Sequence, residues 1–129
     1  MKKIRKKIIK KGNYLYRRST CFLRVLPDFL IIGAQKCGTT SLYRNLVKHP
    51  SIITAFVKEV HFFDNSRNYF QSGVGWYKAH FPSLLYKYYT TRICRNNFLT
   101  GEASPFYMFQ PHAPRRISEL LPGVKMIVL

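Results

Sequence analysis

The chain of 129 residues carries 22 lysines and arginines but only five aspartates and glutamates, a formal net charge of +17 at pH 7. A hydrophobic content of 47%, with ten phenylalanines and nine tyrosines, favours one small packed domain over a disordered chain. The three cysteines form no CxxC pair, which argues against a metal site or a secreted disulfide scaffold and fits a reducing compartment.

The positive charge is concentrated at the N-terminus. Residues 1–27 hold ten Lys/Arg and no acid, whereas residues 28–129 hold twelve Lys/Arg and five acids, a net charge of +7. We therefore expect a basic N-terminal extension over 1–27 and a folded region over 28–129. Residues 1–24 are typical of a basic, helical arm, for which a solvated extension is favoured over contact with an anionic membrane surface. No nucleic acid partner is expected, because the aromatic residues of the arm are too scattered to stack on bases.

Targeting signals are not evident in the sequence. No segment approaches the about 20 apolar residues of a membrane span, and residues 1–24 contain no uninterrupted apolar run like that of a signal peptide. These features predict a cytoplasmic protein, with peripheral membrane contact through the arm as the alternative.

Residues 28–43, DFLIIGAQKCGTTSLY, organise the rest of the chain. The apolar run Phe29–Ile32 predicts a buried parallel strand, and Gly38 closes the turn that follows it. Thr39 and Thr40 stand where the N-cap and first turn of a helix belong. A strand, a glycine-bounded loop and a helix N-terminus together surround an anion with backbone N–H groups, which predicts a phosphate-binding loop.

This loop departs from the pattern of the nucleotide triphosphatases. Gly33 and Gly38 keep the spacing of that pattern, but Thr39 occupies its lysine position, and the loop lysine is instead Lys36. The usual lysine reaches the β- and γ-phosphates of a nucleotide held with magnesium, so this loop is poorly equipped for a triphosphate and its metal. It is suited to a shorter anionic group, held by Lys36, the backbone amides and the two threonine hydroxyls.

Short apolar runs alternate with helical patterns in the remainder of the chain. Strands are expected near 52–54, over 98–102 and, buried, over 124–129; helices are expected between Gly75 and Pro82 and over 113–121, and a surface excursion over 86–97. His112, Arg115 and Arg116 are interpreted as a solvated basic face. The alternation predicts an α/β fold with a P-loop-type parallel sheet flanked by helices, ending after the third predicted core strand. The loops after the first strands should converge at the carboxyl edge of this sheet.

The segment GAQKCGTTSLY resembles the 5′-phosphosulfate loop of sulfotransferases that use 3′-phosphoadenylyl sulfate (PAPS). The likeness is greatest to the heparan-sulfate N- and 3-O-sulfotransferase group and its bacterial relatives, and KEVHFF and GEASPFY resemble two further segments of that family. The resemblance covers residues 28–129, roughly the first half of such a domain. It implies transfer of a sulfuryl group from PAPS to a hydroxyl or amine of a saccharide, with PAP as the nucleotide product and no metal.

The resemblance also implies roles for individual residues. Glu59 would be the catalytic base and His61 would lie near the acceptor, while Lys36 would stabilise charge on the departing phosphate. From the residues alone, Glu59 would be a surface carboxylate paired with Lys58, and a structural histidine is as good an interpretation of His61. The apolar neighbours of Glu59 are expected to raise its pKa toward the range useful for proton abstraction.

The donor-binding residues implied by the resemblance are Lys36, Cys37, Gly38, Thr39, Thr40 and Ser41. Cys37 has no neighbouring base that would make it a nucleophile, and its side chain is interpreted as a small filler.

Two departures from the family pattern weaken the assignment. Ala103 replaces a lysine that many heparan-sulfate enzymes carry in the GEASPFY segment. The arginine- and serine-containing segment that grips the 3′-phosphate of the nucleotide in the family would follow Leu129, so the chain is expected to be an inactive fragment of low solubility. Two alternatives stay open: another P-loop nucleotide-dependent transferase or kinase, and a non-enzymatic basic binding module.

Overall fold

The computed structural model describes residues 2–129 and, within the first helix, the side chains of Lys6 and of Ile9 onward. Its centre is a sheet of four parallel strands in the order β2-β3-β1-β4. The strands are β1 (Phe29–Gly33), β2 (Ile52–Thr54), β3 (Leu99–Ala103) and β4 (Lys125–Val128). The predicted α/β fold of the P-loop type is thereby confirmed.

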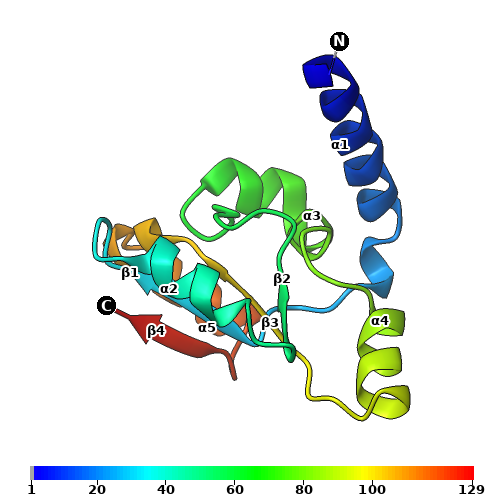
Figure 1. Cartoon of the computed structure of the whole chain (residues 1–129). Helices are drawn as coiled ribbons and strands as arrows, with labels where there is room; N and C mark the ends of the chain where they lie inside the picture. Colours follow the sequence, from blue (N-terminus) through cyan, green and yellow to red (C-terminus); the bar gives the residue numbers. More distant parts are fainter. Residues whose placement is uncertain (1) are drawn as a thin grey trace.

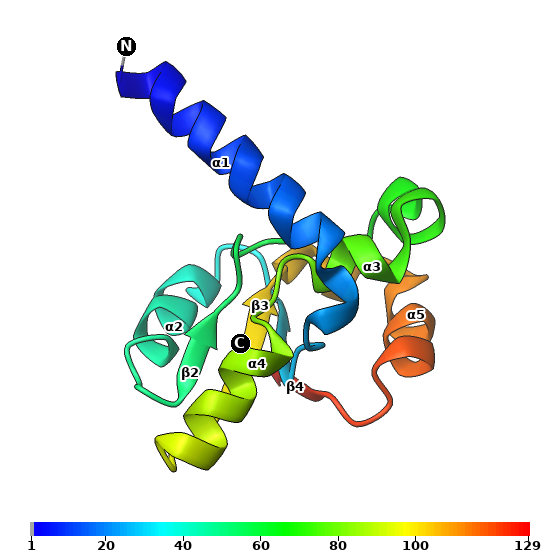
Figure 2. The same ribbon diagram turned by 90° about the vertical axis from the view of Figure 1, so that its right-hand side faces the viewer.

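Helices lie on both sides of this sheet and beside it (Figure 1). They are α1 (Lys2–Ser19), α2 (Thr39–Leu46), α3 (Gly73–Lys78), α4 (Leu84–Tyr88) and α5 (Ala113–Leu120). Shorter helical turns are η1 (Cys21–Leu23), η2 (Arg67–Ser72), η3 (Tyr89–Ile93) and η4 (Pro105–Phe109). The helix α1 projects away from the body of the domain, and its last turns lie close to α3 (Figure 2).

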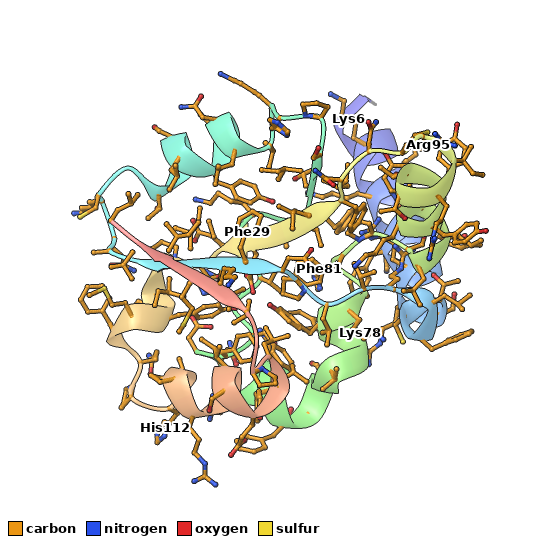
Figure 3. The ribbon with its side chains drawn as sticks, turned by 90° about the horizontal axis from the view of Figure 1, so that it is seen from below. Lys6, Phe29, Lys78, Phe81, Arg95 and His112 are labelled. Atoms are coloured by element: carbon orange, nitrogen blue, oxygen red, sulfur yellow. The ribbon has the colours of Figure 1, made fainter. Side chains whose placement is uncertain are left out.

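The two faces of the sheet have separate apolar cores. Successive side chains of a strand point to opposite faces, so Leu30 of β1 joins one core while Phe29 and Ile31 join the other. The helix α2 covers the face of Phe29 and Ile31, and α5 covers the opposite face (Figure 3). Because both faces are covered, β1 has the continuous apolar run that the sequence shows.

The larger core is aromatic and lies beneath the segment that follows β2. Phe62 stacks on Tyr77 with ring centroids 4.5 Å apart, and Phe63 meets Tyr107 edge to face at 5.4 Å. Phe81 contacts Tyr77 at 5.0 Å and lies in the interior (Figure 3). These rings have defined packing geometry, so they give the preceding residues, 58–61, a rigid base.

Two sequence expectations about this fold are wrong. The segment 124–129 is not a buried strand: β4 is the edge strand of the sheet, paired with β1 alone, and Met126 is 57% exposed. In addition, α3 begins at Gly73 rather than after the glycines. The segment 86–97 is mostly exposed, as expected of a surface excursion, and α4 and η3 give its first part helical turns, with Thr90 Oγ1 donating to the Tyr86 carbonyl at 2.8 Å.

The basic N-terminal segment is helical, as expected, but its end is attached to the domain. Arg17 Nε donates to the carbonyl oxygen of Ala79 at 2.8 Å, and its Nη2 donates to that of Phe81 at 3.0 Å. Arg24 Nη1 donates to the same Phe81 oxygen at 2.9 Å. Burial, with a smaller contribution from the charge of Arg24, lowers the pKa of Arg17 to about 10. The two arginines fix the end of α1 against α3.

Candidate active site

The loop that the sequence predicts to bind phosphate lies between β1 and α2, at the carboxyl edge of the sheet. Lys36 and Gly38 have positive φ angles of 60° and 85°, and this turns the chain so that α2 begins at Thr39. Thr39 is therefore not the N-cap that the sequence predicts: Gly38 is the N-cap, and no side chain caps the helix there. The first N–H groups of a helix have no partner within it, so those of Thr39, Thr40 and Ser41 are suited to an anion.

Lys36 and Cys37 are exposed on this loop. Among the side chains that the structure describes, no hydrogen bond or ion pair engages the Lys36 ammonium group. A lysine so placed beside a helix N-terminus fits a phosphate or sulfate group. The proposed roles of these two residues remain predictions.

Lys58 connects the loop to the segment that carries Glu59. Its Nζ donates a 2.6 Å hydrogen bond to Thr40 Oγ1 and forms an ion pair with Glu59 Oε1. The backbone is fixed at this point, because Ala103 N–H of β3 donates to the Lys58 carbonyl at 2.9 Å. Sequence reasoning noticed Lys58 only as a neighbour of Glu59 and missed its contact with the loop.

Glu59, His61 and Asp64 form a connected set. The Nε2 atom of His61 lies 3.3 Å from Glu59 Oε2, and its Nδ1 atom lies 2.7 Å from Asp64 Oδ2. His61 itself has a positive φ of 55°, which turns its ring toward both carboxylates. Sequence reasoning assigned no role to Asp64, although it is one of only five acids and lies three residues after His61.

The electrostatics of Glu59 differ from the sequence expectation. Partial burial raises the pKa of Glu59, but the hydrogen bond and charge of Lys58, together with His61, outweigh this effect. The pKa of Glu59 therefore lies below its ordinary value, so the expected rise is wrong. The side chain is ionised at neutral pH and able to accept a proton.

His61 is shifted in the opposite direction. Burial lowers the pKa of His61, but the hydrogen bond and charge of Asp64, helped by Glu59, raise it overall. The Asp64 side chain is only 5% exposed. Its second oxygen, Oδ1, is buried and has no donor among the residues that the structure describes.

Glu102 supports the site from beneath. Its fully buried carboxylate accepts hydrogen bonds from Tyr77 Oη at 2.7 Å and Tyr107 Oη at 2.9 Å through Oε1, and from Ser104 Oγ at 2.7 Å and Val60 N–H at 3.0 Å through Oε2. Burial raises the pKa of Glu102, and these hydrogen bonds offset only part of that rise. Glu102 therefore positions the backbone beside Glu59 and is too deeply buried to reach an acceptor.

Arg116 is not part of a solvated basic face. It is 7% exposed and donates to the Phe63 carbonyl at 2.9 Å and to Ser66 Oγ at 3.0 Å. Its guanidinium also lies 4.9 Å from the ring centroid of Tyr69. It joins α5 to the segment after Asp64, whereas His112 and Arg115 are exposed at the rim of a hollow of about 280 Å³. His112 points outward from the start of α5 (Figure 3).

Two further properties concern the described residues only. Within 2–129 no cluster of three or more His, Cys, Asp or Glu side chains is arranged to bind a metal ion. None of the helices described there combines the length and the apolar character that crossing a bilayer requires.

No protein-family model matches the chain, but individual proteins do. It is 38% identical over 107 residues to the membrane-associated sulfotransferase kil1 of Dictyostelium discoideum, an alignment of 83% of this chain and 21% of that protein. It is 40% identical over 118 residues to the bifunctional heparan sulfate N-deacetylase/N-sulfotransferase 4 of Mus musculus, covering 88% of this chain and 12% of that protein. The heparan sulfate glucosamine 3-O-sulfotransferase 5 of Mus musculus is 35% identical over 104 residues, an alignment of 81% of this chain and 27% of that protein.

A solved structure gives the same result. A sulfotransferase from Alicyclobacillus acidocaldarius matches with a TM-score of 0.54 and 34% identity, over 81% of this chain and 44% of that one. The chain thus spans between about a tenth and about a quarter of the length of these curated relatives, and less than half of the bacterial chain. By sequence and by fold, the chain belongs to the sulfotransferase family.

Proposed function

We propose that residues 28–129 form the donor-loop and catalytic-base portion of a PAPS-dependent sulfotransferase that acts on a hydroxyl or amine of a saccharide. The observation that carries the proposal is the connected set from Thr40 through Lys58 and Glu59 to His61. This set joins an anion-binding helix terminus to an ionised carboxylate. The heparan sulfate relatives support a saccharide acceptor.

The donor side of the reaction belongs to the loop. PAPS, when bound, supplies the sulfuryl group, whose bond to the 5′-phosphate oxygen breaks during transfer. The amides of Gly38–Ser41 and the hydroxyls of Thr39 and Thr40 hold the 5′-phosphate, in the manner of other helix N-termini. Lys36 places a positive charge where the phosphate leaving group becomes more negative, and Lys58 adds a second positive charge next to Thr40.

The acceptor side belongs to Glu59 and its partners. Glu59 accepts the proton of the acceptor O–H or N–H while the acceptor atom forms its bond to sulfur. Asp64 holds the His61 ring through Nδ1, so that Nε2 faces Glu59 and the acceptor. No step of this proposed mechanism requires a metal, because the charged side chains of the loop and of 58–61 would stabilise the charge that develops.

A chimaeric enzyme tests this function. Residues 28–129 would replace the matched segment of the Alicyclobacillus sulfotransferase, and we would measure transfer of radiolabelled sulfate from PAPS to desulfated heparan oligosaccharides. We expect transfer that depends on Glu59. A chimaera that folds and binds PAP but transfers sulfate equally well as Glu59→Gln would contradict the assignment of the base. Magnesium-dependent turnover of ATP in place of PAPS would contradict the reaction class and favour a kinase.

A further inference from the structure

The orientation of α1 on the domain is the starting point. Its attachment uses the basic and aromatic side chains of its last turns: Arg17 bonds the Ala79 and Phe81 carbonyls, and Arg18 Nη2 donates to the Ser72 carbonyl at 3.3 Å. Tyr14 contacts His80, with ring centroids 6.0 Å apart. These contacts fix which side of the helix faces the domain.

The apolar side of α1 consequently faces away from the domain. Ile9, Leu15 and Tyr16 are 63%, 59% and 64% exposed. Ile9 and Tyr16 are seven residues, two helical turns, apart and share a face, while Leu15 lies about 100° around the helix from Tyr16. Surface helices of globular domains normally turn their apolar stripe toward the core. Here the three apolar side chains lie in solvent, although the last turns of the helix are held against the domain.

A second exposed apolar group continues this surface. Arg24 pairs with Ser83 in an isolated antiparallel bridge, and Val25 N–H donates to the Pro82 carbonyl at 3.0 Å, so the end of η1 adjoins the start of α4. The apolar side chains next to this junction are exposed: Phe22, Leu23, Leu84, Leu85 and Tyr88. Figures 1 and 2 show α1 and α4 on the same side of the molecule, and Figure 3 shows Lys6 and Arg95 there as well. We name this surface the α1–α4 face.

The charge of the α1–α4 face has one sign. Seven of the first eleven residues are lysine or arginine, and Lys87, Arg92 and Arg95 belong to α4, η3 and the turn after them. Residues 1–27 and 65–101, which supply the whole face, contain no aspartate or glutamate. Exposed apolar side chains surrounded by cations are the composition of a helix that lies in the plane of a membrane interface.

We propose that the α1–α4 face binds the surface of a bilayer that contains anionic lipids, with α1 in the plane of the interface. Ile9, Leu15 and Leu85 enter the boundary between headgroups and acyl chains, and the lysines and arginines contact the lipid phosphates and carboxylates. A second copy of the chain fits this face less well, because two surfaces of the same positive charge would meet. A nucleic acid would leave the aliphatic side chains without a partner. The inference is independent of the proposed transferase activity.

Vesicle sedimentation tests the proposal. The whole chain, fused to a soluble carrier protein, would be mixed with phosphatidylcholine vesicles containing about one third phosphatidylserine, and with pure phosphatidylcholine vesicles. We expect binding to the anionic vesicles that weakens as salt is added. The double variant Ile9→Ser/Leu15→Ser should lower the partition coefficient by about tenfold or more, since two aliphatic side chains that would enter the bilayer become polar. Leu85→Ser should lower it by a smaller factor.

The control is Met126→Ser, which removes an equally exposed apolar side chain from β4, on a different part of the molecule. It should bind the vesicles as the unaltered chain does. Equal loss of binding by Met126→Ser, or undiminished binding by the double variant, would show that the α1–α4 face does not enter the bilayer. Absence of binding to anionic vesicles at low salt would overturn the proposal. Two other results would also overturn the proposal: a dimer that the double variant abolishes, or an RNA complex that is tighter than the vesicle complex and that the double variant abolishes.

Discussion

The ammonium group of Lys58 donates a 2.6 Å hydrogen bond to Thr40 Oγ1, across a separation of 18 residues in the sequence. The same ammonium group forms the ion pair with Glu59. One side chain therefore contacts both the helix terminus that is suited to the donor and the carboxylate that is suited to the acceptor. A change in its charge should affect both functions.

Replacement of Lys58 with methionine should shift the pH dependence of the reaction. Lys58 lowers the pKa of Glu59, so the pKa should rise when the ammonium group is removed. The base must be ionised, and the acid limb of the profile of kcat against pH should therefore move to higher pH in the chimaeric enzyme. Lys48→Met is the matched control, because Lys48 is exposed and bonds only its neighbour Asn45. If the acid limb does not move, Lys58 does not influence the pKa of the catalytic base.

Lys36→Ala should impair catalysis much more than folding. The residue is exposed on the loop, so its removal costs little packing, whereas loss of a charge contact to the transition state typically lowers the rate by about 10²-fold or more. Turnover and thermal unfolding would be measured on the same preparation, with Lys48→Ala beside it. Unchanged turnover would remove Lys36 from the mechanism.

Glu59→Gln should abolish most transfer while leaving the affinity for PAP within a few-fold. The amide keeps the size and hydrogen-bonding capacity of the side chain but cannot accept a proton. Calorimetric titration with PAP would separate binding from chemistry. If the variant stays active, another group must act as the base, and His61 is the nearest candidate at 3.3 Å.

Asp64→Asn should lower the pKa of His61. Partial burial opposes the charged ring, and the hydrogen bond and charge of Asp64 are the main influences that raise the pKa. Without the carboxylate, the ring should lose its proton at lower pH, which NMR titration of the imidazole signals would measure. His80 is the internal reference: burial lowers its pKa, and its Nδ1 is bonded to the Trp76 carbonyl rather than to an acid. If the titration of His61 does not change, Asp64 does not affect the charge state of His61.

Glu102→Gln should destabilise the fold by about 1–3 kcal/mol. The amide turns one acceptor oxygen into a donor, and a buried donor left without a partner costs about 1–3 kcal/mol. Because the pKa of Glu102 is raised, the unfolded chain loses this proton first as the pH increases. This carboxyl therefore makes folding progressively less favourable as the pH rises from the unfolded to the folded pKa, and the loss persists at higher pH. The variant should lack that dependence. Urea unfolding of the chimaera at several pH values would measure both effects, with the exposed Glu119→Gln as a control that changes little.

The parts of the structure that could be predicted from sequence are the local ones. The run Phe29–Ile32 is apolar at every position because β1 is covered on both faces, and the residues after it have the glycine and threonine pattern of a loop followed by a helix. The predicted roles of Glu59 and His61 likewise come from a short segment that resembles known enzymes, and they stay predictions. Each of these inferences depends on residues that are close together in the chain.

The parts that failed depend on distant contacts. The pKa of Glu59 is lowered because the side chains of Lys58 and His61 lie close to its carboxylate. The positions of these two side chains cannot be inferred from the apolar residues that flank Glu59 in the sequence. In the sequence Arg116 cannot be told from an exposed helix arginine, because its burial depends on contacts with Phe63 and Ser66, about 50 residues earlier. The exposure of β4 likewise depends on the strand order, which composition does not specify.

The strand order also governs when the domain can form during synthesis. The central strand β1 begins at Phe29, but its partner β3 begins only at Leu99, which is 99 − 29 = 70 residues later. At a translation rate of about 5–20 residues per second, the apolar run of β1 waits about 4 to 14 s for this partner. In that interval α2 and the aromatic residues of 56–81 can cover its side chains, but its backbone has no strand to pair with, because β1 pairs only with β3 and β4. A nascent chain of this kind exposes an unpaired apolar segment near its start. We therefore expect its folding to depend on chaperones that bind emerging apolar peptides. This dependence should be stronger than for a protein whose strands pair in the order of synthesis.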